Sequence, residues 1–496
     1  MSTRLTKAQL SRLDLKAALA AEVSVPGSLL PVPFLDEAVS SRQADFIRLL
    51  SSRVVAGVIG APPEVLLAKK PRGVRPVLVI PLGARVIYRA VVDEVAKQLP
   101  PLDRSTEAYT KFWNGPLTDR RIVAIALADV TACYQYIDHV LLENELVRQT
   151  GEADLSGVIS GLLGDMVGRA FALPQNQQPS HVLAEVVLGL VERRLIRRGY
   201  RVWRYSDDFR IGGRSRAEVA RGLEDLEREL NSVGLTLNDE KTSIRNRKSY
   251  QDLLKRSRQR LAEVRKLVAE DLAEWNPYTD EITAPKKEDV TLVAALKVVA
   301  DWISDLNSGK QHYGYEAISE RQLLTSALSS FQVLESDEGL PYCRLLLVEE
   351  PSLTPRISAY LGQRCASSAA ARNTVDEIVS DADSELSEWQ CLWLIDAISD
   401  LEGLSVEQIK WARSLMAADP SRLVAARAAV ALAGHDEASE QEIASILSLQ
   451  REAGQGDAVH ALAIRVLPSK GSPVLDAVVS DAPEWSWVVE AAQSGQ

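Results

Sequence analysis

The sequence predicts an α+β fold for the first half of the chain and an all-α fold for the second half. Between about residues 60 and 250, apolar runs rich in Val and Ile alternate with stretches of helical periodicity. From about residue 250 onward, apolar residues recur at helical spacing almost throughout. At 496 residues the chain is long enough for two or three domains.

The two halves also differ in charge. Residues 1–250 carry 35 Lys and Arg against 29 Asp and Glu, a net charge of +6, whereas residues 251–496 carry 22 against 39, a net charge of −17. A basic first half favours binding of a polyanion. An acidic second half would repel nucleic acid and is better suited to protein contacts.

Several classes of protein are excluded. No apolar run reaches the ~18 residues that span a bilayer, and the N-terminus has no secretory signal, so we expect a cytoplasmic protein without membrane contact. The four cysteines, Cys133, Cys343, Cys365 and Cys391, have no C-x-x-C spacing. They therefore indicate neither a disulfide framework nor a zinc site.

The segment Arg201–Ile211 predicts a hairpin with two acids, Asp207 and Asp208, at its tip. Two neighbouring carboxylates in a tight turn repel each other, and a fold that keeps them together usually compensates with divalent cations. A solvated Asp-Asp turn is the alternative.

Upstream, Arg121–Asp129 is an apolar strand that ends in a carboxylate. Together with the acids of the hairpin, Asp129 could supply three hard oxygen donors for two Mg²⁺ ions, with Mn²⁺ as a substitute. Such a pair of ions aligns an attacking hydroxyl and a leaving pyrophosphate for in-line phosphoryl transfer. Asp129 could equally cap the helix that follows it.

In the second half, long helices are predicted over Ser249–Trp275 and Thr291–Leu306. Alanine-rich helices then begin near Glu388, Leu423 and Gly456, at intervals of 35 and 33 residues. This spacing fits a helical repeat array of the HEAT type, and an irregular helical domain fits equally well.

Five segments in a fixed order resemble the motifs of reverse transcriptases. They are the basic fingers segment Lys69–Pro76 with Arg85, motif A with Asp129 and Tyr134, motif B at Leu173–Ser180 leading into the helix His181–Arg198, motif C at Tyr205–Asp208, and motif D at Gly234–Thr242. The resemblance implies a right-hand polymerase with fingers and a palm, the palm being an antiparallel sheet with a two-helix layer. It divides the chain into an N-terminal extension and fingers (1–110), the palm (111–250), a helical connector (251–310) and a repeat-like helical domain (311–496).

The resemblance also implies roles for single residues. Asp129, Val130, Asp207 and Asp208 would hold the metal ions. Tyr134 would lie under the sugar of the incoming nucleotide, where its ring would collide with a ribose 2′-hydroxyl and so select deoxynucleotides. An ordinary core aromatic is the alternative for Tyr134.

Four further residues would act on the nucleotide. Lys70 and Arg75 would neutralise the triphosphate, although a solvated charge run is the alternative for the lysine. Gln175 would touch the nucleotide or the template base. Lys241 would protonate the departing pyrophosphate, unless it is a surface lysine near a turn. His139 and His181, without ligand spacing, suggest packing or surface roles.

One departure from the family pattern concerns template copying. After Pro-Gln, where templated members usually have glycine, this chain has Asn176, whose side chain would keep the backbone farther from the nucleotide or template.

The layout of a short polymerase core and a helical, HEAT-like second half is similar to abortive-infection and related defence-associated bacterial reverse transcriptases. For that group the resemblance implies antiphage defence, assembly into a homo-oligomer, and in several members template-independent DNA synthesis primed by a protein side chain. Deoxynucleoside triphosphates would be the substrates and DNA the product. Tyr313 and Tyr315 are candidate priming residues. Two alternatives remain: a templated enzyme that copies a partner noncoding RNA, and a catalytically idle scaffold that acts through its helical domain.

Overall fold

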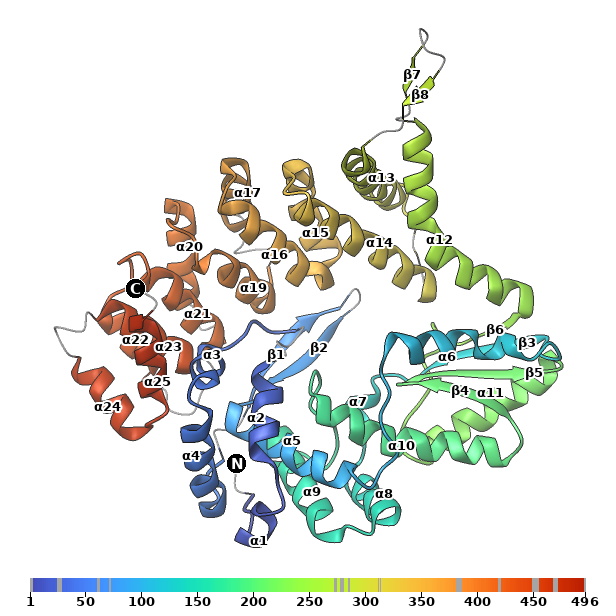
Figure 1. The fold of residues 1–496 in the computed structure, drawn as a ribbon, viewed down its shortest axis with the longest axis horizontal. Coiled ribbons are helices and arrows are strands. Elements are labelled where there is room, and N and C mark those ends of the chain that lie inside the picture. Colours follow the sequence, from blue (N-terminus) through green and yellow to red (C-terminus); the bar gives the residue numbers. More distant parts are fainter. Residues whose placement is uncertain are drawn as a thin grey trace.

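In the computed structural model, a mixed α+β N-terminal region with antiparallel sheets is followed by a largely helical C-terminal half (Figure 1). The fold class is confirmed at this level. The structure describes residues 3–24, 29–59, 63–70, 73–271, 274–276, 281–283, 286–310, 312, 314–380, 386–417, 421–447, 455–466 and 472–494. Among these residues, no helix combines the length and the apolar character that crossing a membrane requires. All four cysteines are buried free thiols.

The N-terminal region holds short helices, a two-stranded hairpin and the helices that precede the main sheet. Its elements are α1 (Lys7–Leu10), α2 (Leu15–Ser24), α3 (Phe34–Ser40), α4 (Gln43–Ala56), β1 (Glu64–Lys69), β2 (Val74–Val79), α5 (Leu82–Ala96) and α6 (Thr106–Thr118). The sheet region that follows contains β3 (Ala124–Asp129), α7 (Cys133–Tyr136), α8 (His139–Thr150), α9 (Ala153–Val167), α10 (Gln178–Arg197), β4 (Arg201–Tyr205), β5 (Asp208–Gly213), α11 (Arg216–Asn231) and β6 (Ser243–Asn246).

The main sheet is antiparallel, with the strand order β4-β5-β3-β6. All six residues of the central strand β3 are buried, which fits its run of small and aliphatic side chains. On one face, Ala126 and Ala128 pack in the core beneath α10 and α11, which form a layer of two helices. On the other face, Ile125 and Leu127 form a separate small cluster with Tyr250. Helices therefore cover both faces.

The C-terminal half is a stack of helices that curves away from the sheet in an arc and returns to the N-terminal helices (Figure 1). Helices α14, α16, α19, α21, α23 and α25 each pack on the next, and the predicted helix starts near Glu388, Leu423 and Gly456 are confirmed within one residue. The elements are α12 (Arg247–Asp271), β7 (Glu274–Asn276), β8 (Glu281–Thr283), α13 (Lys287–Asn307), α14 (Gly314–Val333), η1 (Asp337–Tyr342), α15 (Cys343–Glu349), η2 (Pro351–Leu353), α16 (Thr354–Cys365), α17 (Ala369–Ser380), α19 (Glu388–Ser399), α20 (Val406–Ala417), α21 (Arg422–Ala433), α22 (Glu440–Leu447), α23 (Gln455–Arg465), α24 (Pro473–Asp481) and α25 (Trp485–Ser494).

The β1–β2 hairpin belongs to the core of the helical half. Its inward side chains, Leu66, Ala68 and Val77, are buried in the same cluster as the helices, and β1 packs on α19 and η2. The hairpin carries Lys70 at its turn and Arg75 in β2. The position of these two cations therefore depends on helices more than 280 residues away in the chain.

A second junction joins the segment before α3 to the helical half. Trp389 Nε1 donates to Leu29 O at 2.6 Å, and the ring of Phe34 stacks on His460 with 3.9 Å between centroids. Arg427 donates to Val32 O at 2.8 Å, and its guanidinium lies 4.5 Å from the Phe34 ring. The junction closes the arc of helices onto the N-terminal region.

The junction predicts an acid-sensitive step in stability. Burial, with a further contribution from Arg427, lowers the pKa of His460 to about 4. The unfolded chain, with an ordinary histidine pKa of about 6.5, binds the proton more readily, so stability is lost as the pH falls from about 6.5 towards 4. At pH 5 the loss due to His460 is about 2 kcal/mol. Urea unfolding at pH 7.5 and pH 5 should show a smaller loss for His460→Gln than for the unchanged protein; equal losses would contradict this assignment.

Candidate functional site

Three acids meet where neighbouring strands end. Asp129, the last residue of β3, is the register partner of Asp208, the first residue of β5. Asp207 lies in the two-residue turn between β4 and β5, where Ser206 adopts a left-handed conformation with φ 57°. The backbone N–H of Val130 donates to Asp207 O at 3.1 Å and ties the end of β3 to this turn. The structure thus brings together all four predicted metal-site residues.

The segment Gly234–Thr242 runs along the end of β3 and presents a lysine to the acids. The backbone N–H of Asn238 donates to Asp129 O at 2.8 Å, and Thr131 Oγ1 donates to Leu237 O at 3.0 Å. These bonds place Lys241 Nζ 3.0 Å from Asp129 Oδ1, with the lysine side chain 36% exposed. Lys241 therefore contacts the site and is not a free surface lysine.

The pKa of Asp129 reflects its burial and the charges of its neighbours. Burial raises the pKa of Asp129 to about 6, and the neighbouring acids Asp207 and Asp208 act in the same direction, while Lys241 opposes them. Neighbouring like charges disfavour ionisation of Asp129. The arrangement therefore favours any cation that binds between the three carboxylates.

The turn of the β1–β2 hairpin lies near the same acids. Lys70 is half-buried, and its N–H donates to Gly73 O at 3.1 Å across the hairpin turn. Burial lowers the pKa of Lys70, with further contributions from Arg75 and Lys241, while Asp129 raises it. Electrostatic coupling of Lys70 to both Lys241 and Asp129 indicates that the hairpin turn faces the acids. Arg75 is exposed opposite Ala68.

Tyr134 is held by two residues that sequence reasoning did not assign to the site. Its hydroxyl lies 2.6 Å from His181 Nδ1 and 3.5 Å from Arg104 Nη2. Arg104 also donates to Ser206 Oγ at 3.0 Å, which links the tyrosine to the turn that carries Asp207. Burial and Arg104 lower the pKa of His181 to about 4, so its ring is neutral at pH 7. His181 follows motif B directly, and this proximity is the signal that could have identified it.

Arg210 is a second residue that the sequence analysis missed. It is fully buried, lies 3.5 Å from Asp208 Oδ1, and stacks on Phe112 and Trp113 of α6 at 4.6 and 4.4 Å. A buried guanidinium next to a carboxylate fixes the orientation of that carboxylate. Its signal in the sequence is weak, because an arginine in an alternating strand usually faces solvent.

The loop before α10 contains Gln175, which is half-buried, and Asn176, which has φ 61°. Asparagine tolerates this left-handed region, where glycine is the more usual residue. Asn176 therefore forms a tight backbone turn here, and it lines a hollow of about 330 Å³ bounded by α2, the segment before α3, β2, α5 and this loop. The predicted priming residue Tyr313 and the side chain of Tyr315 lie outside the described residues.

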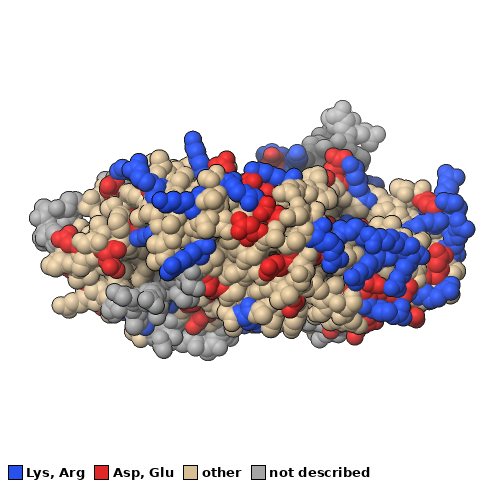
Figure 2. Space-filling view, turned by 90° about the horizontal axis from the view of Figure 1, so that it is seen from below, with Lys and Arg blue, Asp and Glu red and all other residues tan. Residues whose placement is uncertain are grey.

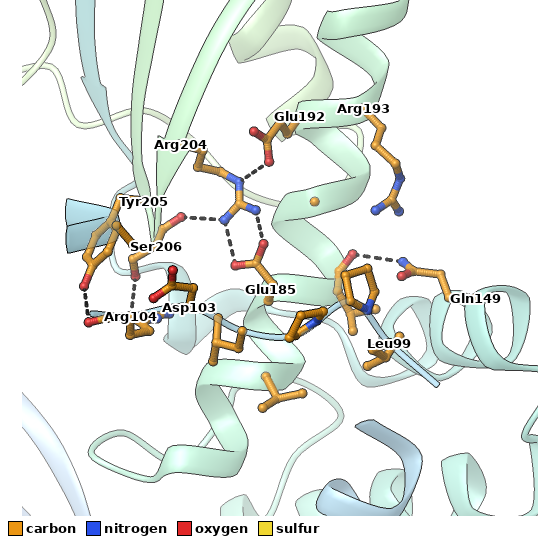
Figure 3. A pocket seen from close by; sticks show the side chains of 17 residues that line it. Leu99, Asp103, Arg104, Gln149, Glu185, Glu192, Arg193, Arg204, Tyr205 and Ser206 are labelled. Atoms are coloured by element: carbon orange, nitrogen blue, oxygen red, sulfur yellow. Dashed lines mark hydrogen bonds and ion pairs between the residues drawn. The ribbon is translucent and has the colours of Figure 1, made fainter. Parts of the chain in front are cut away.

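A second hollow of about 310 Å³ lies beside the β4–β5 turn, between α10 and the loop before α6 (Figure 3). Ser206 and Arg104 line one side of it and Arg193 the other. In its wall, Arg204 binds Glu185 and, at 2.9 Å, Glu192. Arg204 therefore neutralises part of the negative charge of the two glutamates.

The donor set suits a hard divalent cation. Within the described part of the chain, no group of three or more His, Cys, Asp or Glu side chains is arranged to hold a metal ion, and this includes the three acids. Mg²⁺ does not require such a group, because it keeps several waters and takes one or two carboxylates together with substrate phosphates. Asp129 and Asp208 pair with Lys241 and Arg210 here, so an ion that enters with a nucleotide would compete with these two cations for the carboxylates.

No family model matches the chain, and no curated protein matches its sequence. Among solved structures it is similar to telomerase from Candida albicans in complex with a TWJ fragment of telomeric RNA, with a TM-score of 0.31, 11% identity, and coverage of 69% of this chain and 64% of that chain. It is also similar to the corresponding Candida tropicalis complex, with a TM-score of 0.28, 12% identity, and coverage of 67% of each chain. Similarity this low says nothing about the residues of the site.

Proposed function

We propose that this protein is a Mg²⁺-dependent DNA polymerase of the reverse-transcriptase type, with its nucleotidyl-transfer site at Asp129, Asp207 and Asp208. One observation carries the proposal: Asp129 and the adjacent pair Asp207 and Asp208, distant from it in sequence, meet at neighbouring strand ends of the antiparallel sheet, with Lys241 bound to Asp129 and Lys70 close enough to interact electrostatically with both. A structural ion-pair network would not need three like charges next to each other.

Each residue has a role in this reaction. When bound, Mg²⁺ stabilises the charge that develops on the transferred phosphoryl group. Asp129, Asp207 and Asp208 provide its oxygen ligands, and Val130 ties the two strand ends together through its N–H. Lys70 and Arg75 contact the triphosphate, and Lys241 donates a proton to the departing pyrophosphate.

The biological setting is a further part of the proposal. We assign the protein to antiphage defence and to a homo-oligomer, with template-independent, protein-primed synthesis, because the layout of its motifs and helical half is similar to enzymes of that kind. Protection of cells against phage by the unchanged protein, lost on Asp207→Ala/Asp208→Ala at equal protein level, would support the defence role and exclude an idle scaffold.

The reaction itself is tested with purified protein, Mg²⁺ and labelled deoxynucleotides, without template or primer. We expect label that stays with the protein on a denaturing gel, is released by protease, and is absent with Asp207→Ala/Asp208→Ala. Activity that appears only after RNA and a primer are added would instead make this a templated enzyme. No incorporation under either condition would contradict the proposal.

Tyr134 gives a prediction about sugar selectivity. His181 and Arg104 hold the Tyr134 hydroxyl and so fix the orientation of the ring, and in the proposed reaction this ring excludes a 2′-hydroxyl. Tyr134→Ala should raise the efficiency of ribonucleotide relative to deoxynucleotide incorporation by about 10- to 100-fold, the range expected for one steric contact. Competition between labelled ATP and dATP measures the ratio, and Tyr136→Ala, at an exposed tyrosine nearby, is the matched control. An unchanged ratio would leave Tyr134 as a packing residue.

A further inference from the structure

The outer side of the two-helix layer carries an arginine strip that extends from α8 across α10 to α11. Figure 2 shows Lys and Arg side chains gathered on the right of this face, where Figure 1 places these helices. The strip consists of Arg148, Arg193, Arg194, Arg197, Arg198, Arg221 and Arg228. It stands out on a chain whose net charge is −11.

Three acids of the strip lie beneath the arginines, while Glu224 and Glu227 of α11 are exposed beside them. Glu145 and Glu229 have side chains only 3% and 9% exposed, and each binds two arginines. Asp225, 19% exposed, is likewise shared by Arg198 and Arg228. Because three acids hold five arginines, they fix the guanidinium groups in place and leave a surplus of positive charge facing outward.

Two further arginines add to this surplus. Arg197 and Arg221 are exposed and form no ion pair with any residue that the structure describes. Arg228 has a side chain 66% exposed, and it shares its partner Asp225 with Arg198. The five arginines that the acids hold make the strip more than a solvated charge run, because these side chains are partly ordered before a ligand binds.

The strip is connected to the candidate catalytic site through α10. His181, in the first turns of the helix, contacts Tyr134, and Arg197 is the last helical residue, about 24 Å farther along at 1.5 Å per residue. The hollow beside the β4–β5 turn extends along the same helix, with Ser206 at one side and Arg193 at the other (Figure 3). It offers a route from the acids to the strip.

We infer that the arginine strip binds the phosphate backbone of a nucleic-acid strand whose end lies at the β4–β5 turn. Guanidinium groups suit phosphate because they are planar, permanently charged and able to donate two parallel hydrogen bonds. Contacts of this kind carry affinity without sequence preference. The strand is the DNA product or an RNA template, and this part of the inference rests on the proposed function.

The test measures binding without catalysis. Fluorescence anisotropy would report the affinity of the full-length protein for a single strand of about 20 nucleotides, longer than common single-strand site sizes, as DNA and as RNA, without Mg²⁺ or nucleotide. The variant Arg197→Ala/Arg221→Ala/Arg228→Ala removes three exposed charges and leaves each buried acid at least one arginine. We expect binding about tenfold weaker or more, and a salt dependence shallower by about two in log–log slope.

Two matched variants make the result specific. Lys287→Ala/Arg356→Ala/Lys410→Ala removes the same charge from exposed positions of the helical half and should bind as the unchanged protein does. Arg197→Lys/Arg221→Lys/Arg228→Lys should retain most of the affinity. Stronger binding of DNA would identify the product strand, and stronger binding of RNA the template; either result supports the inference.

Equal binding by the strip variant and the helical-half variant would overturn the inference. So would a strip variant that binds nucleic acid normally but sediments as a smaller particle, because the strip would then dock the acidic helical half of a second copy. The variant Asp207→Ala/Asp208→Ala should bind at least as tightly as the unchanged protein, because it removes negative charge from the place where the end of the strand lies. Failure of the proposed reaction therefore remains distinguishable from failure of the strip.

Discussion

Asp129→Asn should lower the rate of nucleotide transfer by about 10³-fold or more, the loss expected when a metal ligand worth several kcal/mol is removed. Asparagine has nearly the same shape, but it is neutral and offers one oxygen instead of two. It also removes the partner that Lys241 contacts at 3.0 Å. Single-turnover incorporation of a labelled deoxynucleotide measures the effect.

The control is Asp239→Asn, a change of the same chemistry at an exposed position in the segment that carries Lys241. It should leave the rate within about a factor of two, as surface substitutions usually do. A comparable loss in both variants would mean that folding or net charge, and not metal coordination, limits the reaction. Raising the Mg²⁺ concentration should not restore Asp129→Asn to the rate of the unchanged protein.

Arg427→Met should destabilise the protein by about 3–5 kcal/mol, because it leaves two carboxylates without their cation. Arg427 lies 2.8 Å from Asp396 Oδ1 and 3.0 Å from Asp457 Oδ2, with its own side chain only 4% exposed. Burial raises the pKa of Asp457, and it raises the pKa of Asp396 to about 6. Urea unfolding monitored by circular dichroism measures the loss at pH 7.5.

The same change at a surface pair is the control. Arg413 on α20 lies 3.1 Å from Glu437, but its side chain is 49% exposed, so Arg413→Met should cost only about 0–1 kcal/mol. If Arg427→Met proved as mild, the junction between the segment before α3 and the helical half would not stabilise the fold. At pH 5 the Arg427→Met effect should shrink, because Asp396 is then largely protonated.

Local patterns predicted the elements that carry the acids. The apolar run ending at Asp129 and the hairpin around Asp207 and Asp208 follow from residue spacing alone, and both elements are present, with Asp207 in the turn and Asp208 as the first residue of β5. The alanine-rich helices of the second half also begin where their composition changes. Short-range patterns of this kind predict helices and strands correctly because each element buries its own apolar face.

The long-range contacts could not be predicted in this way. The hairpin that carries Lys70 looks like part of an N-terminal unit in sequence, yet Leu66, Ala68 and Val77 are buried among helices from the other half. Arg210 and Arg104 contact residues on other helices and strands, and these contacts cannot be predicted from a single sequence. The buried acids that organise the arginine strip are hidden for the same reason.

The most direct test of the central claim is to locate the metal. Crystals soaked with Mn²⁺ and a non-hydrolysable deoxynucleoside triphosphate would be examined by anomalous scattering. We expect a peak within coordination distance of Asp129 and Asp207, with Lys241 displaced from Asp129, and no such peak with Asp129→Asn. A nucleotide that binds with its Mn²⁺ elsewhere, leaving the Lys241–Asp129 ion pair intact, would contradict the assignment of these three acids as the nucleotidyl-transfer site.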